Sequence, residues 1–418
     1  MGNVVDYVRS EFRTFDELAF SNVDSLVLSE LSYMRLSGLV PTFETAKSVA
    51  TVPIARLLRA EDYPVMFASN SNDMNDYRLS LLRAVCESPR FRGLRVGEYA
   101  ERLDERREQQ FAAMTFDLGD CPHVAAAQDR DDSADSPTDA AGLLYVAFRG
   151  TDGTLVGWKE DFNMAVRCPV PSQESAYRYV DSVMDRSSGF LSASPAPGIM
   201  IGGHSKGGNM ATYAAMLVTQ HDIARSCERA RNLGLMPALG GAVEGRNGRI
   251  RKVYSHDGPG LPQAMVDGQA YRAIGRRIDK TVPESSIVGM LLQTSARYTV
   301  VKADAIGIMQ HLGSSWRVTG GAFERANGLS GVAQVMKRTI DAWLETVGQE
   351  QRERAINQIY EIFASTGYAN IADLTANWTD SLPKILAAAK STDRETRTLI
   401  LDVLKAVPAS AAKALDPR

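Results

Sequence analysis

The 418-residue chain has little cysteine and histidine, no marked excess of charge and no long apolar run. Its four cysteines are scattered without a C-x-x-C pair, which argues against a zinc site or a disulfide framework and indicates a reducing, cytoplasmic location. A formal net charge of −3 gives no electrostatic reason to expect a nucleic-acid partner. No stretch approaches the ~20 apolar residues that span a bilayer, and Met1–Asp16 lacks the apolar run of a signal peptide. We therefore expect a cytoplasmic protein without stable membrane insertion.

Three regions of the chain differ in pattern. Residues 1–110 have a helical pattern, including Asn22–Leu36 after a capping Ser21, and the charged Glu98–Gln110 predicts a helix with a solvated face. Residues 111–320 alternate short apolar runs with helical segments, which predicts a mostly parallel sheet covered on both faces. Residues 321–418 repeat apolar positions at helical spacing and predict a C-terminal helical subdomain. Within the middle region, the acidic, small-residue-rich segment 119–142 predicts a flexible loop. The expected strands are Phe111–Leu118, Leu143–Phe148, Gly198–Gly202, Arg251–Ser255 and Tyr298–Lys302.

One motif in the middle region carries chemistry. Gly203–Gly207 reads G-x-S-x-G, follows an apolar strand and opens an alanine-rich helical segment, which is the arrangement of a nucleophile elbow. A serine on such a tight turn points above the sheet, and Gly203 and Gly207 would avoid Cβ clashes around it. Backbone N–H groups at the start of the helix would face a developing oxyanion. Ser205 is therefore the candidate nucleophile; the alternative is a glycine-rich turn with no catalytic role.

Five histidines leave few candidates for the general base. His123 precedes Ser205 and lies in the acidic loop, and His204 is part of the elbow itself. His221 comes about 22 Å along the elbow helix, and His256 directly follows the next strand beside the best acid candidate. Because α/β-hydrolases order their triad as serine, acid, histidine, His311 is the predicted base.

The acid is less sharply defined by the sequence. Asp257 stands at the carboxyl end of the Arg251–Ser255 strand, where catalytic groups gather in open sheets. Asp304 follows the Tyr298–Lys302 strand in the same way, and Asp279 lies in a polar stretch. We take Asp257 as the predicted acid with Asp304 as the alternative; either could instead cap a turn.

A second loop could complete the site. Phe148–Thr154, followed by Trp158 and Asp161, ends another predicted strand, and loops of this kind supply the second oxyanion donor in α/β-hydrolases. Thr151 could donate both its N–H and its hydroxyl. Without Ser205 the segment would be an ordinary Gly-Thr-Asp-Gly turn.

These residues resemble the class 3 (fungal-type triacylglycerol) lipases, and more closely a bacterial lipase-like family of α/β-hydrolases long described as a domain of unknown function. The phrases that carry the resemblance are Phe148–Met164, Gly203–Asn209, Tyr254–Gly260, Val282–Leu291 and Gln310–Trp316. The resemblance implies Ser205 as nucleophile, His311 as base, Thr151 and the Lys206 N–H as the oxyanion hole, and Asp161 as a support for the oxyanion loop. In class 3 lipases the acid lies where this chain has Ser286, so the resemblance implies that the acid comes from elsewhere, with Asp257 the natural substitute.

The sequence thus predicts an α/β-hydrolase core over residues 111–320 with additional N- and C-terminal helices. The predicted activity is hydrolysis of a small-molecule or lipid-like acyl ester by a Ser205–His311–Asp257 triad, with no cofactor and no metal. A thioesterase, acyltransferase or amidase on the same triad is the alternative, because fold and triad do not determine the acyl acceptor. A catalytically silent binding protein or a helical interaction protein is the rival from another class.

Overall fold

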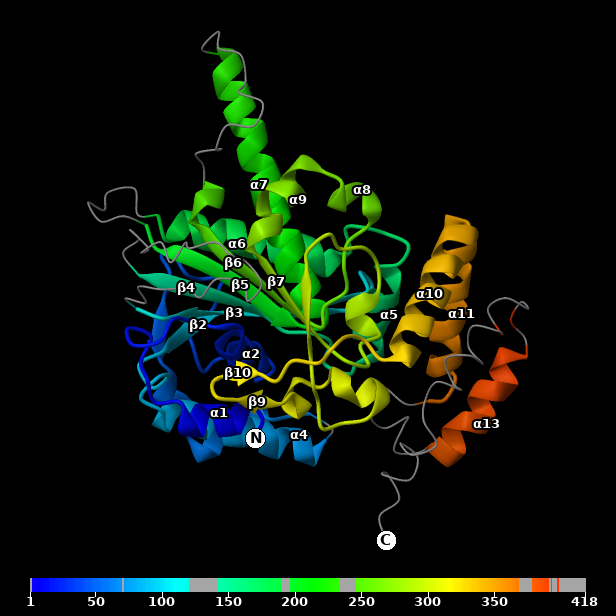
Figure 1. The fold of residues 1–418 in the computed structure, drawn as a ribbon, viewed down its shortest axis with the longest axis horizontal. Coiled ribbons are helices and arrows are strands. Elements are labelled where there is room, and N and C mark those ends of the chain that lie inside the picture. Colours follow the sequence, from blue (N-terminus) through cyan, green and yellow to red (C-terminus); the bar gives the residue numbers. More distant parts are fainter. Residues whose placement is uncertain are drawn as a thin grey trace.

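An eight-stranded sheet runs through the centre of the computed structural model, which describes residues 2–69, 71–119, 142–188, 196–232, 246–367, 378–390, 392 and 397 (Figure 1). The strands lie side by side in chain order, antiparallel from β1 to β4 and parallel from β4 to β8. They are β1 (Thr51–Pro53), β2 (Arg95–Asp104), β3 (Gln109–Asp117), β4 (Leu143–Phe148), β5 (Gly198–His204), β6 (Ile250–His256), β7 (Ile278–Pro283) and β8 (Tyr298–Val301). Since parallel strands end at one edge of the sheet, the segments that follow β4 to β8 meet there.

Helices cover both faces of the sheet, as predicted (Figure 1). One face carries α6 (Pro171–Arg186), α7 (Lys206–Asn232), α8 (Gln263–Val266) and α9 (Gln269–Ile274), and the other carries α1 (Val4–Ser10), α2 (Asn22–Leu31) and α4 (Asn72–Glu87). The short helix α3 (Tyr63–Met66) packs into the same apolar cluster as α1, α2 and α4 through Met66. Side chains along β4 alternate between the two apolar clusters: Tyr145 packs with the N-terminal helices, and Val146 packs with α6 and α7. Both faces of this strand are therefore buried, which explains its continuous apolar sequence.

The structure corrects one prediction made from charge. Residues 98–104 of the predicted Glu98–Gln110 helix belong to strand β2, and Gln109 begins β3. Glu98 is fully buried at a bulge with φ +52°, where its carboxylate pairs with Arg186 at 2.5 Å. Glu101 pairs with Arg149. These charges pair with arginines from other elements and do not form a solvated helix face. The sequence did not predict β7, because Asp279 and Lys280 interrupt its apolar run.

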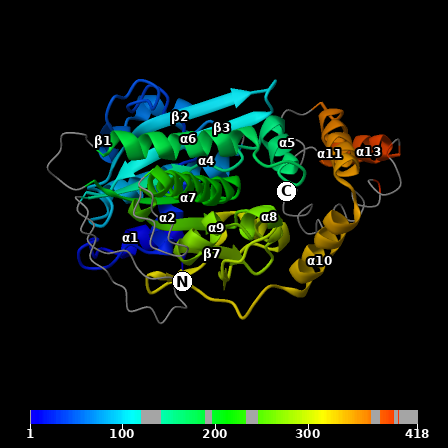
Figure 2. The same ribbon diagram turned by 90° about the horizontal axis from the view of Figure 1, so that it is seen from above.

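The C-terminal helices lie to one side of the sheet, next to α5 (Leu155–Asn163), in both views (Figures 1 and 2). They are α10 (Gly331–Thr346), α11 (Gln349–Ala364) and α13 (Trp378–Ala389), and they follow the short hairpin β9 (Val318–Thr319) and β10 (Ala322–Phe323). These helices agree with the pattern over residues 329–385. Residues 120–141 of the predicted loop lie outside the described residues. The last predicted helix, near residue 403, lies outside them as well. Within the described part of the chain, no helix has both the length and the apolar character needed to cross a membrane.

Candidate active site

Ser205 occupies the turn between β5 and α7 with φ +58°, in the left-handed region that non-glycine residues seldom adopt. Its N–H donates to the carbonyl of His256 at 2.9 Å, which ties the turn to the end of β6. Glycines are required around it, because a Cβ on Gly207 would lie 2.2 Å from the Phe148 carbonyl oxygen and one on Gly203 would lie 2.4 Å from Gly207. The backbone thus has the strained geometry of an elbow that opens a helix.

Asp257 and His311 meet at the same edge of the sheet. The Nδ1 of His311, at the end of the turn Gly307–His311, lies 2.6 Å from Oδ2 of Asp257, which directly follows β6. Asp257 is fully buried with φ +48°, and its N–H donates to Thr281 at 2.7 Å, while His311 is 22% exposed. The alternative acid Asp304 pairs instead with the Nε of Arg317 at 2.6 Å and is 65% exposed. Asp257 is therefore the carboxylate that contacts His311.

Ser286 has a contact that the sequence did not reveal. Its hydroxyl donates to Oδ1 of Asp257, the carboxylate oxygen that His311 leaves free. The position at which class 3 lipases were expected to hold their acid thus provides a hydrogen bond to the acid on the neighbouring strand. Gly289 packs against the same oxygen, which would lie 2.2 Å from any added Cβ.

His204 connects the elbow to the loop that carries His311. Its Nε2 lies 2.6 Å from the carbonyl oxygen of His311, and because a carbonyl only accepts, Nε2 carries the proton. Its Nδ1 therefore accepts from the hydroxyl of Tyr33 at 3.0 Å. Burial, together with the nearby His311, lowers the pKa of His204 to about 3, so the ring is neutral at physiological pH. The rings of His204 and His311 are 4.7 Å apart, so His311 lies beside the residue that precedes Ser205.

The other histidines have structural partners or lie outside the described residues. His256 contacts the hydroxyl of Ser25 on α2 at 2.8 Å, and burial lowers its pKa to about 3. His221 contacts the hydroxyl of Tyr177 at 2.7 Å. His123 lies outside the described residues.

The loop after β4 lies against the elbow. A Cβ on Gly150 would lie 2.6 Å from the carbonyl oxygen of His204 and 3.1 Å from Cβ of Ser205. The next residue, Thr151, donates its hydroxyl to Oδ2 of Asp161 on α5. Because the hydroxyl proton is engaged there, the N–H of Thr151 is the group left to act as an oxyanion donor. Burial raises the pKa of Asp161 to about 6.

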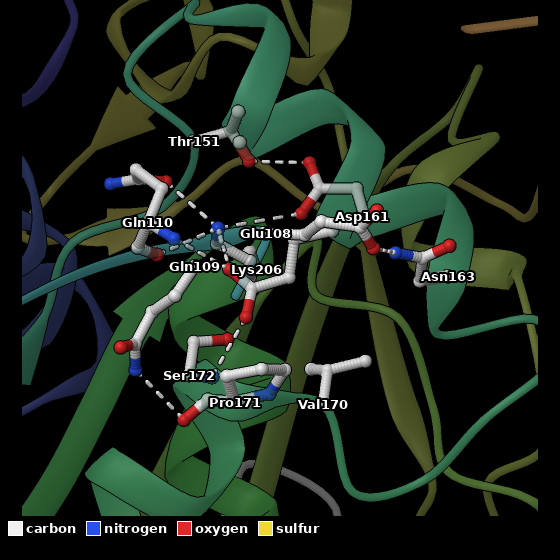
Figure 3. Close-up of polar contacts among 12 residues, drawn as sticks. Glu108, Gln109, Gln110, Thr151, Asp161, Asn163, Val170, Pro171, Ser172 and Lys206 are labelled. Atoms are coloured by element: carbon white, nitrogen blue, oxygen red, sulfur yellow. Dashed lines mark hydrogen bonds and ion pairs between the residues drawn. The ribbon is translucent and has the colours of Figure 1, made fainter. Parts of the chain in front are cut away.

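Beneath this loop lies a buried charged network centred on Lys206 (Figure 3). The Lys206 side chain is fully buried, and its Nζ donates to the carbonyl and side-chain oxygens of Gln110 at 2.9 and 2.8 Å. It also lies 3.1 Å from Oε2 of Glu160 and 3.7 Å from Oδ1 of Asp161. Glu160 accepts in turn from the backbone N–H groups of Gln110 and Ser172. The sequence indicated a role only for the N–H of Lys206, since nothing in the spacing shows that the carboxylates of Glu160 and Asp161, 46 and 45 residues earlier, meet this side chain.

Among the described residues, no group of three histidine, cysteine, aspartate or glutamate side chains is arranged to hold a metal ion. The catalytic roles predicted for Ser205, His311, Asp257, Thr151, Lys206 and Asp161 remain predictions. The structure brings Asp257 to His311 and Thr151 to Asp161, and it sets the Thr151 loop against the elbow.

Residues 85–361 match the model of a family described as Mbeg1-like. No curated protein matches the chain. Three solved lipase structures are similar to it. The Rhizomucor miehei lipase in its native propeptide complex is 18% identical with a TM-score of 0.29, and the match covers 50% of this chain and 57% of that one. The lipase from Rhizopus microsporus var. chinensis is 14% identical with a TM-score of 0.33, covering 68% and 72%. The M37 lipase is 13% identical with a TM-score of 0.35, covering 79% and 82%.

The fold class predicted from the sequence is confirmed. The chain has a mostly parallel central sheet flanked by helices, with a strand–turn–helix elbow at its carboxyl edge, as in an α/β-hydrolase. The predicted resemblance to a lipase-like family is confirmed as well.

Proposed function

Because the chain belongs to the Mbeg1-like family and carries a strained serine turn at the carboxyl edge of its parallel sheet, we propose that it is a serine hydrolase that cleaves an acyl ester. The observation that carries the proposal is the 2.6 Å contact between Asp257 and His311 beside the strained turn of Ser205. A buried carboxylate on one imidazole nitrogen fixes the tautomer, so the other nitrogen is free to accept a proton.

The proposed reaction proceeds through an acyl-enzyme. Ser205 Oγ attacks the ester carbonyl carbon and its proton passes to Nε2 of His311, while the N–H groups of Thr151 and Lys206 bind the oxyanion. The carbon–oxygen bond to the alcohol then breaks, and the alcohol leaves with the proton from His311. Water attacks the acyl-enzyme by the same route in reverse, which releases the carboxylic acid and restores Ser205.

Steady-state hydrolysis of p-nitrophenyl esters of increasing acyl length tests this proposal. We expect turnover by the wild type and a loss of about 10⁶-fold in kcat for Ser205→Ala. The acyl length with the highest kcat/KM then gives the substrate class, from small esters to lipid-like ones. Wild-type protein that is folded and turns over no ester in the series would refute ester hydrolysis.

An acyl-CoA assayed in parallel separates esters from thioesters. Both acyl donors are expected to form the same acyl-enzyme, so the ratio of their kcat/KM values reports on the leaving group. A kcat/KM for the thioester above that for every ester would make the protein a thioesterase on the same triad.

A further inference from the structure

The nucleophile elbow presents an unusual residue directly after the serine. Lys206 begins α7, and its backbone N–H is a predicted oxyanion donor, yet its side chain is fully buried. A buried ammonium is stable only when it is paired and hydrogen-bonded. Lys206 satisfies this condition with two oxygens of Gln110 and one of Glu160, all within 3.1 Å.

Two acidic side chains lie near the Lys206 ammonium, but only one of them accepts a hydrogen bond from it. Glu160 is fully buried and accepts from Lys206 and from two backbone N–H groups. Its neighbour Asp161 uses Oδ2 to accept from Thr151, whereas its buried Oδ1 has no hydrogen-bond partner. The nearest ion-pair partner of that oxygen among the described residues is Lys206, 3.7 Å away (Figure 3).

We propose that the Lys206 ammonium is a positioning group that keeps Asp161 ionised and thereby holds Thr151 in place for the oxyanion hole. This inference rests on the proposed function, because Thr151 matters only if an oxyanion forms. Lys206 then acts on both donors of the hole: it supplies one through its backbone N–H, and through its side chain it fixes the loop that supplies the other.

The physical reason is electrostatic. An ionised Asp161 accepts the Thr151 hydroxyl, while a protonated Asp161 carries a competing O–H and no longer attracts Lys206. Burial raises the pKa of Asp161 to about 6, with Lys206 and Thr151 lowering it and Glu160 raising it. His311 and Tyr33 also lie within electrostatic range of Asp161, and His311 lowers the pKa of Asp161. Removal of the ammonium must therefore raise the pKa of Asp161 above 6 and release the Thr151 loop nearer neutral pH.

The variant Lys206→Met tests the inference, because methionine keeps the apolar stem and removes the charge. With p-nitrophenyl esters we expect a loss of about 10²-fold in kcat with little change in KM, the size seen when one oxyanion donor is lost. The acid limb of the kcat/KM profile should also move up by about one to two pH units. A merely structural role would leave this limb in place for the folded fraction, and an unmoved limb overturns the inference.

Three further variants keep the test decisive. Lys206→Met with Glu160→Gln removes both charges, so it avoids leaving Glu160 buried and unpaired should the single variant not fold. We expect a shift of the acid limb in the same direction but smaller in this pair, because the Glu160 charge that raises the pKa of Asp161 is removed as well. In an Asp161→Asn background, Lys206→Met should leave the acid limb in place, because the titrating group is gone; an equal shift there contradicts the inference.

Lys159→Met is the matched control, since Lys159 lies on the same helix as Asp161 but pairs with Glu108 at 2.8 Å. Its acid limb should not move.

A measurement without turnover separates this inference from the proposed function. The ¹³C carboxyl resonance of Asp161, assigned with Asp161→Asn in aspartate-labelled protein, should titrate near pH 6 in the wild type and higher in Lys206→Met. If the wild type hydrolyses no ester but the resonance still shifts, the proposed function fails and the electrostatic link between Lys206 and Asp161 stands. If esters are hydrolysed and the titration is unchanged, the inference fails alone.

Discussion

Asp257 is held beside His311 by three contacts. Its N–H donates to Thr281, one carboxylate oxygen accepts from Ser286, and the other lies 2.6 Å from His311. These contacts come from β7 and from the loops that follow β7 and β8, so they fix the carboxylate although its backbone has φ +48°. At the scale of single residues, the proposed triad therefore depends on groups beyond the three that take part in the chemistry.

Asp257→Asn is expected to reduce kcat by about 10⁴-fold, because the amide stabilises the wrong tautomer of His311. Asp304→Asn should leave kcat unchanged, since Asp304 is exposed and pairs with Arg317. Steady-state kinetics of the two variants on one p-nitrophenyl ester measure this difference. A large loss for Asp304→Asn and none for Asp257→Asn would show that the wrong acid has been assigned.

Ser286→Ala removes one hydrogen bond to the Asp257 carboxylate. A hydrogen bond to a charged group contributes about 1.5–3 kcal/mol, so we expect kcat to fall by roughly 10- to 100-fold with KM nearly constant. The neighbouring Ser285→Ala serves as control, because the Ser285 hydroxyl contacts Ser330 and not the triad. Equal rates for the two variants would mean that Ser286 does not support the acid.

The sequence allowed Ser205, His311 and Asp257 to be predicted as one site because each follows a strand of the parallel sheet and the chain offers few histidines. The contact between the last two is in the structure. The roles of Ser286 and of the Lys206 side chain could not be read in this way. Each depends on which side chains face one another across 29 to 46 residues of chain, and spacing along the sequence does not contain that information.

At the scale of elements, β2 shows why charge misled the prediction. Glu98 and Glu101 lie on a strand, and both bind arginines from other elements, Arg186 on α6 and Arg149 after β4. In β7, Lys280 is likewise buried and donates to the Gly258 carbonyl at 2.7 Å. A charged residue in an amphipathic pattern is ordinarily solvated, so only the tertiary partners identify these segments as strands.

The N-terminal helices are joined by one fully buried ion pair. Arg90, after α4, contacts both carboxylate oxygens of Asp24 on α2 at 2.6 and 2.8 Å, and the hydroxyl of Tyr7 on α1 binds the same carboxylate at 2.8 Å. The remaining guanidinium N–H groups donate to backbone carbonyls of residues 13–19. This group of contacts links α1, α2 and the end of α4.

Arg90→Met is expected to lower the free energy of unfolding by about 3–5 kcal/mol, because it leaves the Asp24 charge buried without its partner. Denaturant unfolding followed by circular dichroism measures the change. Arg59→Met is the control: Arg59 is 56% exposed and pairs with Glu61, so its loss should cost at most about 1 kcal/mol. Similar values for the two variants would contradict a joining role for Arg90.

At the scale of the whole molecule, two buried neutral histidines make stability depend on pH. Burial lowers the pKa of His204 and of His256 to about 3, whereas the unfolded side chain has a pKa of about 6.5. The unfolded chain therefore binds more protons between these values, so this part of the stability is complete above pH ~6.5 and is lost as the pH falls toward 3. His256 also stabilises the packing of α2 on the sheet, because its ring contacts the hydroxyl of Ser25 on α2.

Each of these histidines is expected to contribute about 1.4 kcal/mol per pH unit to the decline. Urea unfolding at intervals from pH 8 to pH 4 should therefore show a free energy of unfolding that decreases as the pH is lowered from about 6.5. His256→Gln should be less stable at pH 8 but should show a shallower slope, since one of the two groups no longer titrates. An unchanged slope in this variant would refute a buried neutral His256.

For the molecule as a whole, the alternation of strands and helices was sufficient to predict a mostly parallel sheet with both faces covered. The antiparallel extension through β1 and β2 was not predicted, because these strands lie in a region with a helical pattern and charged side chains. The proposed activity depends on the carboxyl edge of the parallel part, which brings the segments after β4 to β8 together.

The central claim is that Ser205, at the carboxyl edge of the sheet, is the catalytic nucleophile. Intact-mass and peptide mass spectrometry after treatment with a fluorophosphonate tests it directly, because the reagent phosphonylates only a serine activated by its base. We predict one adduct per wild-type chain, located on the peptide that contains Ser205, and none on folded Ser205→Ala. Folded wild-type protein that remains unlabelled, or that carries the adduct on another residue, would contradict the claim.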